Sequence, residues 1–237
     1  MICAVLFDLD GTLVQTEELK ARSYAEAAAE LAPGVNQDAV VAEFSHLAGQ
    51  SREAVARTLL AQFHLPGTWN DFVARRLARY DAMLDDAALL RRQALPGATT
   101  LLARVRKAGL RTALTTMSDP AHARCILAAL GLTDAFEAVI TPADVPHGKP
   151  APDMYQTVTA RLKCLPADCV AIEDSVAGIT AAVAAGVPCI AVPTWLTRDA
   201  VRAAGLVPPE RLADDPAQVG RVFDAYATGK DARWKSE

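Results

Sequence analysis

The sequence predicts an α/β protein built on a doubly wound, Rossmann-like parallel sheet, with an all-helical domain inserted close to the N-terminus. Short apolar runs of strand length recur along the chain and alternate with segments of helical periodicity, as in that fold class. Acidic and hydroxyl residues follow several of these runs, at the position where open α/β sheets bind their ligands. Residues 16–93 contain no such run. This stretch is much longer than the connection of about a dozen residues that parallel strands require, which indicates an inserted domain.

The first predicted strand, residues 2–7, is continuously apolar and ends at Asp8, a pattern typical of a buried parallel strand. The other strands are predicted at residues 111–116, 138–141, 170–172 and 188–192. They follow helical segments or glycines that end helices, such as Gly109 and Gly186. This alternation of strands and helices favours parallel pairing of the strands.

The inserted stretch is rich in alanine, leucine, arginine and glutamate, and its periodicity predicts amphipathic helices. They are expected at residues 17–31, 37–47, 51–63 and 69–84, with breaks at 33–34, 46–50 and 66–67. We therefore expect a helical domain over residues 16–93 and a sheet domain made of residues 1–15 and 94–237. Two further helices are predicted in the sheet domain, at 98–108 and at 216–227. The second lies in a C-terminal tail, residues 214–237, whose charged end is expected to fray.

The composition is that of an ordinary globular protein, with 51% hydrophobic and 22% charged residues. A net charge of −4 and a pI near 5.6 provide no broad basic field for nucleic acid or an anionic membrane surface. No apolar run reaches the length of about 20 residues that crosses a bilayer, and the N-terminal run lacks the basic leader of a signal peptide. We expect a cytoplasmic protein, a monomer or small homo-oligomer, that binds neither nucleic acid nor membrane.

The five cysteines show no paired spacing of the kind that zinc sites use. They are interpreted as small, buried, reduced residues, as is usual in the cytosol. The four histidines are scattered and are assigned to the surface or to packing. Because the net charge is negative, an anionic substrate requires a local cluster of positive charge or a metal.

Asp8 and Asp10 flank one residue at the end of the first strand. Side chains alternate along an extended segment, so the two carboxylates can project to the same side and share one cavity. They repel each other unless a cation lies with them or one is protonated. The first case favours magnesium, and the second supplies a general acid beside a nucleophile. The alternative is an aspartate that only caps the following helix.

Three more strand ends carry polar groups. Thr116 and Met117 precede a helix, so a hydroxyl and backbone amides meet there, which suits an oxyanion but is also a common helix cap. Lys149 lies in a loop stiffened by prolines, although most lysines are simply solvated. Glu173 and Asp174 follow another apolar strand, where capping by Asp174 is again the alternative.

These segments resemble, in order, the four signature motifs of haloacid-dehalogenase-like hydrolases: FDLDGTL at 7–13, Thr116, GKPAPD at 148–153 and EDSVAG at 173–178. The resemblance covers residues 2 to about 193. It implies that Asp8 attacks phosphorus to give an aspartyl-phosphate and that Asp10 is the general acid and base.

The same resemblance implies the ligands. Thr116, the Met117 backbone and Lys149 would hold the phosphoryl oxygens. Mg²⁺ would lie on Asp8, the Asp10 carbonyl, Asp174 and the phosphate, with Glu173 bound directly or through water.

The position of the insertion resembles the helical cap of the branch that contains phosphoglycolate phosphatases and beta-phosphoglucomutases. In that branch the cap closes over the site and contacts the part of the substrate beyond the phosphate. Thr16, Lys20 and the segment 49–53, which contains Arg52, resemble the substrate-facing part of the mutase cap. Lys20 and Arg52 would then bind hydroxyls or a second anionic group; the alternative is a solvated helix face.

We therefore predict a magnesium-dependent phosphatase acting on a small phosphorylated metabolite, with a sugar phosphate favoured. A beta-phosphoglucomutase-type activity is an alternative, but Lys20 stands where those mutases carry a histidine. A true haloacid dehalogenase lacks an acid at the position of Asp10, and a phosphonoacetaldehyde hydrolase needs a cap lysine whose surroundings do not resemble those of Lys20. A non-catalytic phosphometabolite-binding protein would more readily have lost Asp8 or Asp10.

Overall fold

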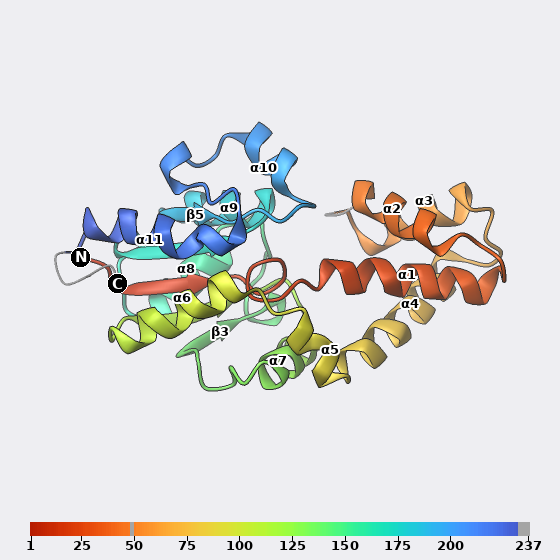
Figure 1. Ribbon diagram of the computed structural model, residues 1–237, viewed down its shortest axis with the longest axis horizontal. Coiled ribbons are helices and arrows are strands. Elements are labelled where there is room, and N and C mark those ends of the chain that lie inside the picture. Colours follow the sequence, from red (N-terminus) through yellow and green to blue (C-terminus); the bar gives the residue numbers. More distant parts are fainter. Residues whose placement is uncertain (48–49, 232–237) are drawn as a thin grey trace. The chain divides into compact units, whose positions relative to one another are not determined.

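The computed structural model describes residues 1–47 and 50–231, and the chain forms two compact units. One unit consists of Met1–Gln15 and Arg91–Glu237, and the other of Thr16–Leu90. Figure 1 shows the sheet of the first unit and the helices of the second.

The first unit is built on a five-stranded, fully parallel sheet with the strand order β3-β2-β1-β4-β5. The strands are β1 Ala4–Phe7, β2 Arg111–Thr115, β3 Ala138–Ile140, β4 Cys169–Glu173 and β5 Cys189–Ala191. The central strand β1 is buried along its whole length, which explains why its sequence is continuously apolar. In its register, Phe7 lies opposite Leu114 of β2 and Ile172 of β4, so the three strands end together.

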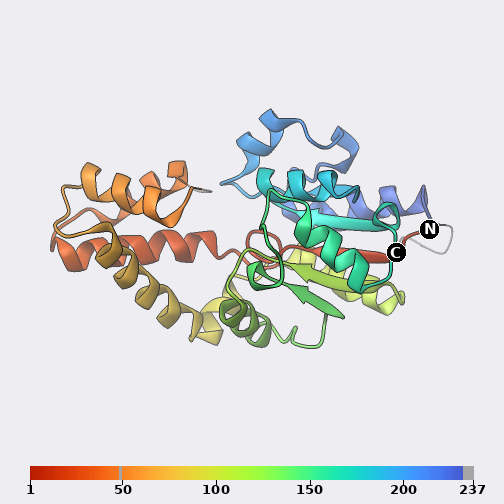
Figure 2. The same ribbon diagram turned by 180° about the vertical axis from the view of Figure 1, so that it is seen from behind.

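Helices cover both faces of this sheet. They are α6 Pro96–Lys107, α7 Pro120–Ala129, α8 Asp153–Arg161, α9 Val176–Ala184, α10 Arg198–Ala204 and α11 Val219–Thr228. Helices α6 and α11 contact each other in front of the sheet in Figure 1, while α8 lies on the opposite face, as the reverse view in Figure 2 shows. The side chains of Ala4 and Leu6 pack into the cluster that includes α8 and α9. The alternation of side chains along β1 thus supplies a core on each face.

The second unit contains α1 Glu17–Leu31, α2 Gln37–Leu47, α3 Arg52–Gln62 and α4 Trp69–Leu84, while α5 Ala87–Arg92 begins in it and ends beyond it. The Ser51 and Thr68 side chains cap α3 and α4 by accepting hydrogen bonds from backbone N–H groups. The core gathers around Tyr24, whose ring lies 5.4 Å from that of Phe44 and 5.7 Å from that of Phe72. These apolar contacts explain the helical periodicity of the sequence.

The predicted fold class, a doubly wound parallel sheet with an N-terminal helical insertion, is confirmed. All five strands lie where they were expected, within two residues. The helix predicted at 216–227 is wrong at its start, because Asp215 caps a separate 3-10 turn, Pro216–Gln218, before α11 begins. Helices α5 and α10 were not predicted. In the described part of the chain, no helix is both long and apolar enough to span a membrane; residues 232–237, part of the tail expected to fray, lie outside it.

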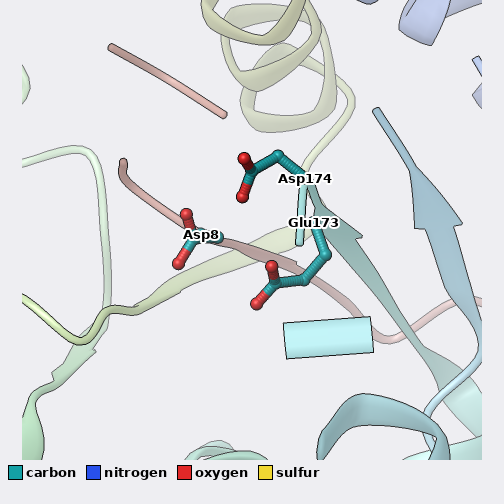
Figure 3. Close-up of side chains that lie close together, drawn as sticks. All are labelled: Asp8, Glu173 and Asp174. Carbon is teal, nitrogen blue, oxygen red and sulfur yellow. The ribbon is translucent and has the colours of Figure 1, made fainter. Parts of the chain in front are cut away.

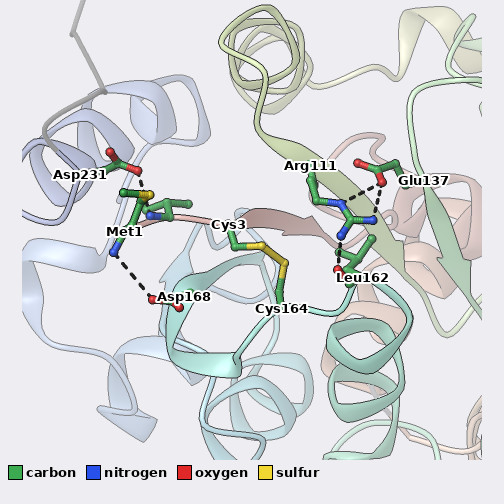
Figure 4. Close-up of a disulfide and its surroundings, with 9 residues drawn as sticks. Met1, Cys3, Arg111, Glu137, Leu162, Cys164, Asp168 and Asp231 are labelled. Atoms are coloured by element: carbon green, nitrogen blue, oxygen red, sulfur yellow. Dashed lines mark hydrogen bonds and ion pairs between the residues drawn. A yellow bond between two sulfur atoms is a disulfide. The ribbon is translucent and has the colours of Figure 1, made fainter.

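The interpretation of all five cysteines as reduced thiols is wrong. Cys3 and Cys164 form a disulfide whose Cα atoms are 6.1 Å apart, and 161 positions separate them in sequence. Figure 4 shows the bond joining the segment before β1 to the turn after α8. Spacing in sequence carried no signal for this pair, since the fold alone brings the two segments together. Cys125, Cys169 and Cys189 are not disulfide-bonded.

Candidate active site

The carboxyl ends of three neighbouring strands bring the predicted residues to one edge of the sheet. Asp8 directly follows β1, Thr116 directly follows β2, and Glu173 is the last residue of β4. The Asp8 N–H donates a hydrogen bond to the Ile172 carbonyl at 3.0 Å, which fixes the end of β1 against β4. In open parallel sheets this edge is where ligands bind.

Three buried carboxylates form a cluster at this edge. Asp8, Glu173 and Asp174 each offer a carboxylate oxygen, and the three oxygens lie within 4.8 Å of one another. Figure 3 shows the three side chains gathered at the ends of β1 and β4. Such crowding of like charges is unfavourable without a compensating cation. Carboxylate oxygens are also the ligands that Mg²⁺ prefers.

Lys149 supplies one compensating charge. Its ammonium donates to Asp8 Oδ1 at 2.7 Å, to Glu173 Oε1 at 2.6 Å and to the Thr115 carbonyl at 2.8 Å. An ammonium has three donors, so all of them are used in this arrangement. The Lys149 side chain is only 4% exposed, and these ion pairs are therefore weakly screened by solvent.

Tyr155 adds a second donor to the Glu173 carboxylate. Its hydroxyl donates to Glu173 Oε1 at 2.7 Å, and its ring lies below Lys149 Nζ, with 5.6 Å between the nitrogen and the ring centroid. Tyr155 is completely buried on α8. Tyr155 could not be singled out from the sequence, because a tyrosine at the start of a helix resembles any other core aromatic.

Burial and neighbouring charges shift the pKa values of these groups. Burial raises the pKa of Asp8; Lys149 opposes this rise, whereas the carboxylates of Glu173 and Asp10 add to it. Burial alone would lower the pKa of Lys149, but the charges of Asp8 and Glu173 outweigh it and raise the pKa above its ordinary value. Burial raises the pKa of Tyr155 as well, and the Glu173 charge reinforces it. Lys149 is thus an ammonium at neutral pH, and Tyr155 a neutral phenol able to donate.

Asp10 lies outside the three-carboxylate cluster and has its own partners. Its Oδ2 accepts hydrogen bonds from the Ser118 hydroxyl at 2.7 Å and from the Thr116 hydroxyl at 3.3 Å. The Ser118 N–H in turn donates to the Thr116 hydroxyl at 3.0 Å. The loop after β2 thus holds the Asp10 carboxylate. Ser118 was not singled out as a site residue from the sequence, although its place two residues after Thr116 was a usable signal.

Two glycines leave room for the acidic side chains. A Cβ at Gly11 would lie 2.3 Å from Asp174 Oδ2, and Gly11 has a φ of +86°, which other residues rarely adopt. A Cβ at Gly178 would lie 2.0 Å from Glu173 Oε2. Met117, half of whose surface is exposed, packs its thioether against Gly148, the residue before Lys149.

The cluster fits a divalent cation. The three carboxylates and the Lys149 ammonium together carry a charge of −2, which a single Mg²⁺ would balance. Glu173 Oε2 is buried and has no hydrogen-bond partner among the residues that the structure describes. A buried charged oxygen without a partner is costly, and a metal ion or its bound water would satisfy it.

The predicted cap residues belong to the helical unit. Thr16 is buried just before α1, and the Lys20 ammonium donates to Glu17 at 2.5 Å. Arg52 is the exposed first residue of α3; of the segment 49–53, Gly49 lies outside the described residues. The sequence analysis missed Arg76 of α4, a buried cation whose guanidinium lies over the ring of Tyr24 at 5.0 Å.

Two relatives of known name align along most of the chain. Protein CbbY of Cereibacter sphaeroides is 34% identical over 227 residues, covering 93% of this chain and 95% of the relative. Hexitol phosphatase B of Escherichia coli is 29% identical over 197 residues, covering 81% of this chain and 84% of the relative.

Two solved structures share the fold. A putative beta-phosphoglucomutase from Thermotoga maritima superposes with a TM-score of 0.78 at 26% identity, covering 95% of this chain and 99% of that one. CbbY from Rhodobacter sphaeroides, solved with xylulose-(1,5)bisphosphate, superposes with a TM-score of 0.70 at 27% identity, covering 93% of this chain and 97% of that one.

Residues 2–186 match the family described as haloacid dehalogenase-like hydrolase. With this match and a relative at 34% identity over nearly the whole chain, the protein belongs to the haloacid dehalogenase-like hydrolase family.

Proposed function

We propose that this protein is a magnesium-dependent phosphatase that hydrolyses the phosphomonoester of a small sugar or polyol through an aspartyl-phosphate on Asp8. The observation that carries the proposal is the position of Asp8. Its carboxylate lies at a strand end, paired with Lys149 at 2.7 Å and clustered with Glu173 and Asp174. This arrangement supplies a fixed nucleophile beside groups suited to a metal and a phosphate.

Asp8 performs the first step of the proposed reaction. One of its carboxylate oxygens attacks phosphorus, and the bond between phosphorus and the leaving oxygen of the substrate breaks. Lys149 fixes Asp8 Oδ1, which limits the orientations from which the carboxylate can attack. In the second step water attacks the same phosphorus, releases inorganic phosphate and restores the Asp8 carboxylate.

Asp10 transfers the protons. As a carboxylic acid it protonates the leaving oxygen in the first step, and as a carboxylate it then takes a proton from the attacking water. Its Oδ2 is held by Ser118 and Thr116, outside the three-carboxylate cluster, which keeps the acid–base role separate from the nucleophile. The two aspartates thus differ in role because they differ in surroundings.

Asp8, Glu173, Asp174 and the backbone carbonyl of Asp10 would hold the metal. When bound, Mg²⁺ neutralises the carboxylates and the phosphate charge and aligns the two for in-line displacement. Thr116, the Met117 backbone and Lys149 would receive the phosphoryl oxygens. Because all three Lys149 donors are already used, Lys149 must release one of its present acceptors to bind phosphate.

The helical unit is proposed to act as a cap domain that recognises the part of the substrate beyond the phosphate. The proposed cap domain spans residues 16–93, and the proposed catalytic domain consists of residues 1–15 and 94–237. Thr16, Lys20 and Arg52 are the proposed contacts, since a hydroxyl and two cations suit the hydroxyls or second anionic group of a sugar phosphate. The likeness to hexitol phosphatase B and to the sugar-bisphosphate complex of CbbY supports this substrate class.

A beta-phosphoglucomutase-type activity is the second candidate, favoured by the likeness to the Thermotoga maritima structure. It would return the phosphoryl group to a different hydroxyl of the sugar instead of to water. Lys20 argues against it, because those mutases carry a histidine at this position in the resemblance described above.

The test is phosphate release from a panel of sugar phosphates, polyol phosphates, phosphoglycolate and nucleotides, with magnesium and with chelator. We expect magnesium-dependent release that is fastest with a sugar or polyol phosphate and absent for Asp8→Asn. Conversion of beta-glucose 1-phosphate to the 6-phosphate without phosphate release would favour the mutase. No turnover in either assay would contradict both candidates and favour a binding protein.

A further inference from the structure

Tyr155 contacts the acidic cluster from helix α8 through Glu173. It projects from the first turn of α8, is completely buried, and donates its hydroxyl to Glu173 Oε1 at 2.7 Å. Glu173 is equally buried at the end of β4. The hydroxyl is therefore part of the interior of the site and has no access to bulk solvent.

Glu173 Oε1 receives two hydrogen bonds, one from Tyr155 and one from Lys149. Lys149 has no spare donor and must release an acceptor when it binds a phosphoryl oxygen. Of its acceptors, Glu173 Oε1 has Tyr155 as a second donor, so Glu173 can lose Lys149 without losing its position. A carboxylate with no remaining donor would be free to rotate.

The Glu173 carboxyl group is also confined by Gly178. A Cβ at Gly178 would lie 2.0 Å from Oε2 and 2.1 Å from Oε1, so the whole group lies against the Gly178 backbone. Glu173 Oε2 has no hydrogen-bond partner among the described residues. The contact with Gly178 and the hydrogen bond from Tyr155 together leave the carboxylate few orientations.

We propose that Tyr155 is a positioning residue for the metal site: its hydroxyl holds Glu173 in place for the metal while Lys149 turns to the phosphoryl group. This inference rests on the proposed function, since it assumes that the cluster binds magnesium. Removing a residue that hydrogen-bonds to a metal ligand typically lowers metal affinity by roughly 10- to 100-fold.

Tyr155→Phe tests this role cleanly. It removes only the hydroxyl and retains the ring below Lys149. Tyr226→Phe is the matched control, because it removes a phenol hydroxyl from α11 in the same unit, outside the acidic cluster. Magnesium binding to the metal-free proteins is measured by titration calorimetry, and the magnesium concentration for half-maximal phosphatase activity is measured in parallel.

We expect Tyr155→Phe to bind Mg²⁺ about tenfold more weakly than the wild type, with Tyr226→Phe unchanged. At saturating magnesium, kcat of Tyr155→Phe should recover to within about twofold of the wild type, because the chemical groups are intact. In a Glu173→Gln background, the change at Tyr155 should have no further effect on magnesium affinity, since Tyr155 acts through Glu173.

Equal magnesium affinity of Tyr155→Phe and wild type would overturn this inference and leave the proposed function standing. A wild type that binds no magnesium would overturn both. Thermal unfolding in chelator checks the fold: a Tyr155→Phe protein without a cooperative transition would mean that the hydroxyl is needed for folding, which also contradicts a role confined to the metal site.

Discussion

The backbone of Gly178 lies directly against the Glu173 carboxylate: a Cβ at Gly178 would be 2.0 Å from Glu173 Oε2. Real Cβ atoms do not approach an oxygen so closely, so any other residue at position 178 must displace either α9 or Glu173. Because α9 is anchored at its start by the Ser175 side chain, which accepts a hydrogen bond from the Gly178 N–H, the carboxylate is the part expected to move.

Gly178→Ala is therefore expected to weaken magnesium binding while leaving the protein folded. The displaced carboxylate would lose its hydrogen bonds to Lys149 and Tyr155 and its place in the acidic cluster. We expect magnesium affinity to fall by roughly tenfold or more, as measured by calorimetry. Gly220→Ala on α11 is the control, because its Cβ would meet only the flexible end of Arg104. Unchanged affinity in Gly178→Ala would show that Glu173 is not required for the metal.

Ser118→Ala should lower kcat with little change in KM. The Ser118 hydroxyl holds the Asp10 carboxylate at 2.7 Å, and the Thr116 hydroxyl, at 3.3 Å, is the weaker donor that remains. A hydrogen bond to a charged group is worth about 1.5–3 kcal/mol, so kcat should fall by roughly ten- to 150-fold. Steady-state kinetics at saturating magnesium measures the effect. A rise in KM at constant kcat would instead place Ser118 in substrate binding.

Magnesium binding should depend on pH through Asp8. Burial raises the pKa of Asp8 in the metal-free protein, so protons compete with the metal for its carboxylate at a higher pH than for an ordinary aspartate. Magnesium affinity should therefore fall as the pH drops through this raised pKa, and binding should release a proton below that pKa but none well above it. Calorimetry in two buffers with different ionisation enthalpies counts these protons. Affinity that increases on acidification would contradict the assignment of Asp8 as a ligand.

The disulfide should stabilise the fold measurably. It closes a loop across 161 positions, and native disulfides typically contribute about 2–4 kcal/mol. For a chain of this size, reduction should lower Tm by roughly 5–15 °C. The double variant Cys3→Ser/Cys164→Ser should unfold at the lower temperature and be insensitive to reductant, while Cys125→Ser should behave as the wild type. Alkylation of both Cys3 and Cys164 in the unreduced protein would show that the bond is absent in solution.

The fold was predictable because short, mainly apolar strands alternate with helices, and β1 is apolar along its whole length. The burial of β1 between two helical layers produces the continuous run before Asp8, and each strand end was marked by a change in composition. Asp8, Thr116 and Glu173 could be placed together for the same reason: parallel neighbouring strands end at one edge.

Contacts between residues that are far apart in the sequence leave no pattern from which they can be predicted. Tyr155 reaches Glu173, and Cys3 reaches Cys164, only because α8 packs across the sheet. A single helix was predicted from Pro216 onward, because Pro216 suits the first turn of an α-helix and of a 3-10 turn equally well.

The role of Asp8 as the phosphorylated nucleophile is tested most directly by quenching the enzyme in acid during turnover of its best substrate, labelled on phosphorus. We expect the label on the peptide that contains Asp8, released by hydroxylamine as an acyl phosphate would be. Asp8→Asn should carry no label and release no phosphate, while Asp214→Asn, which alters an exposed ion pair with Arg202, should match the wild type. Turnover that persists in Asp8→Asn, or label found on another residue, would contradict the proposed mechanism.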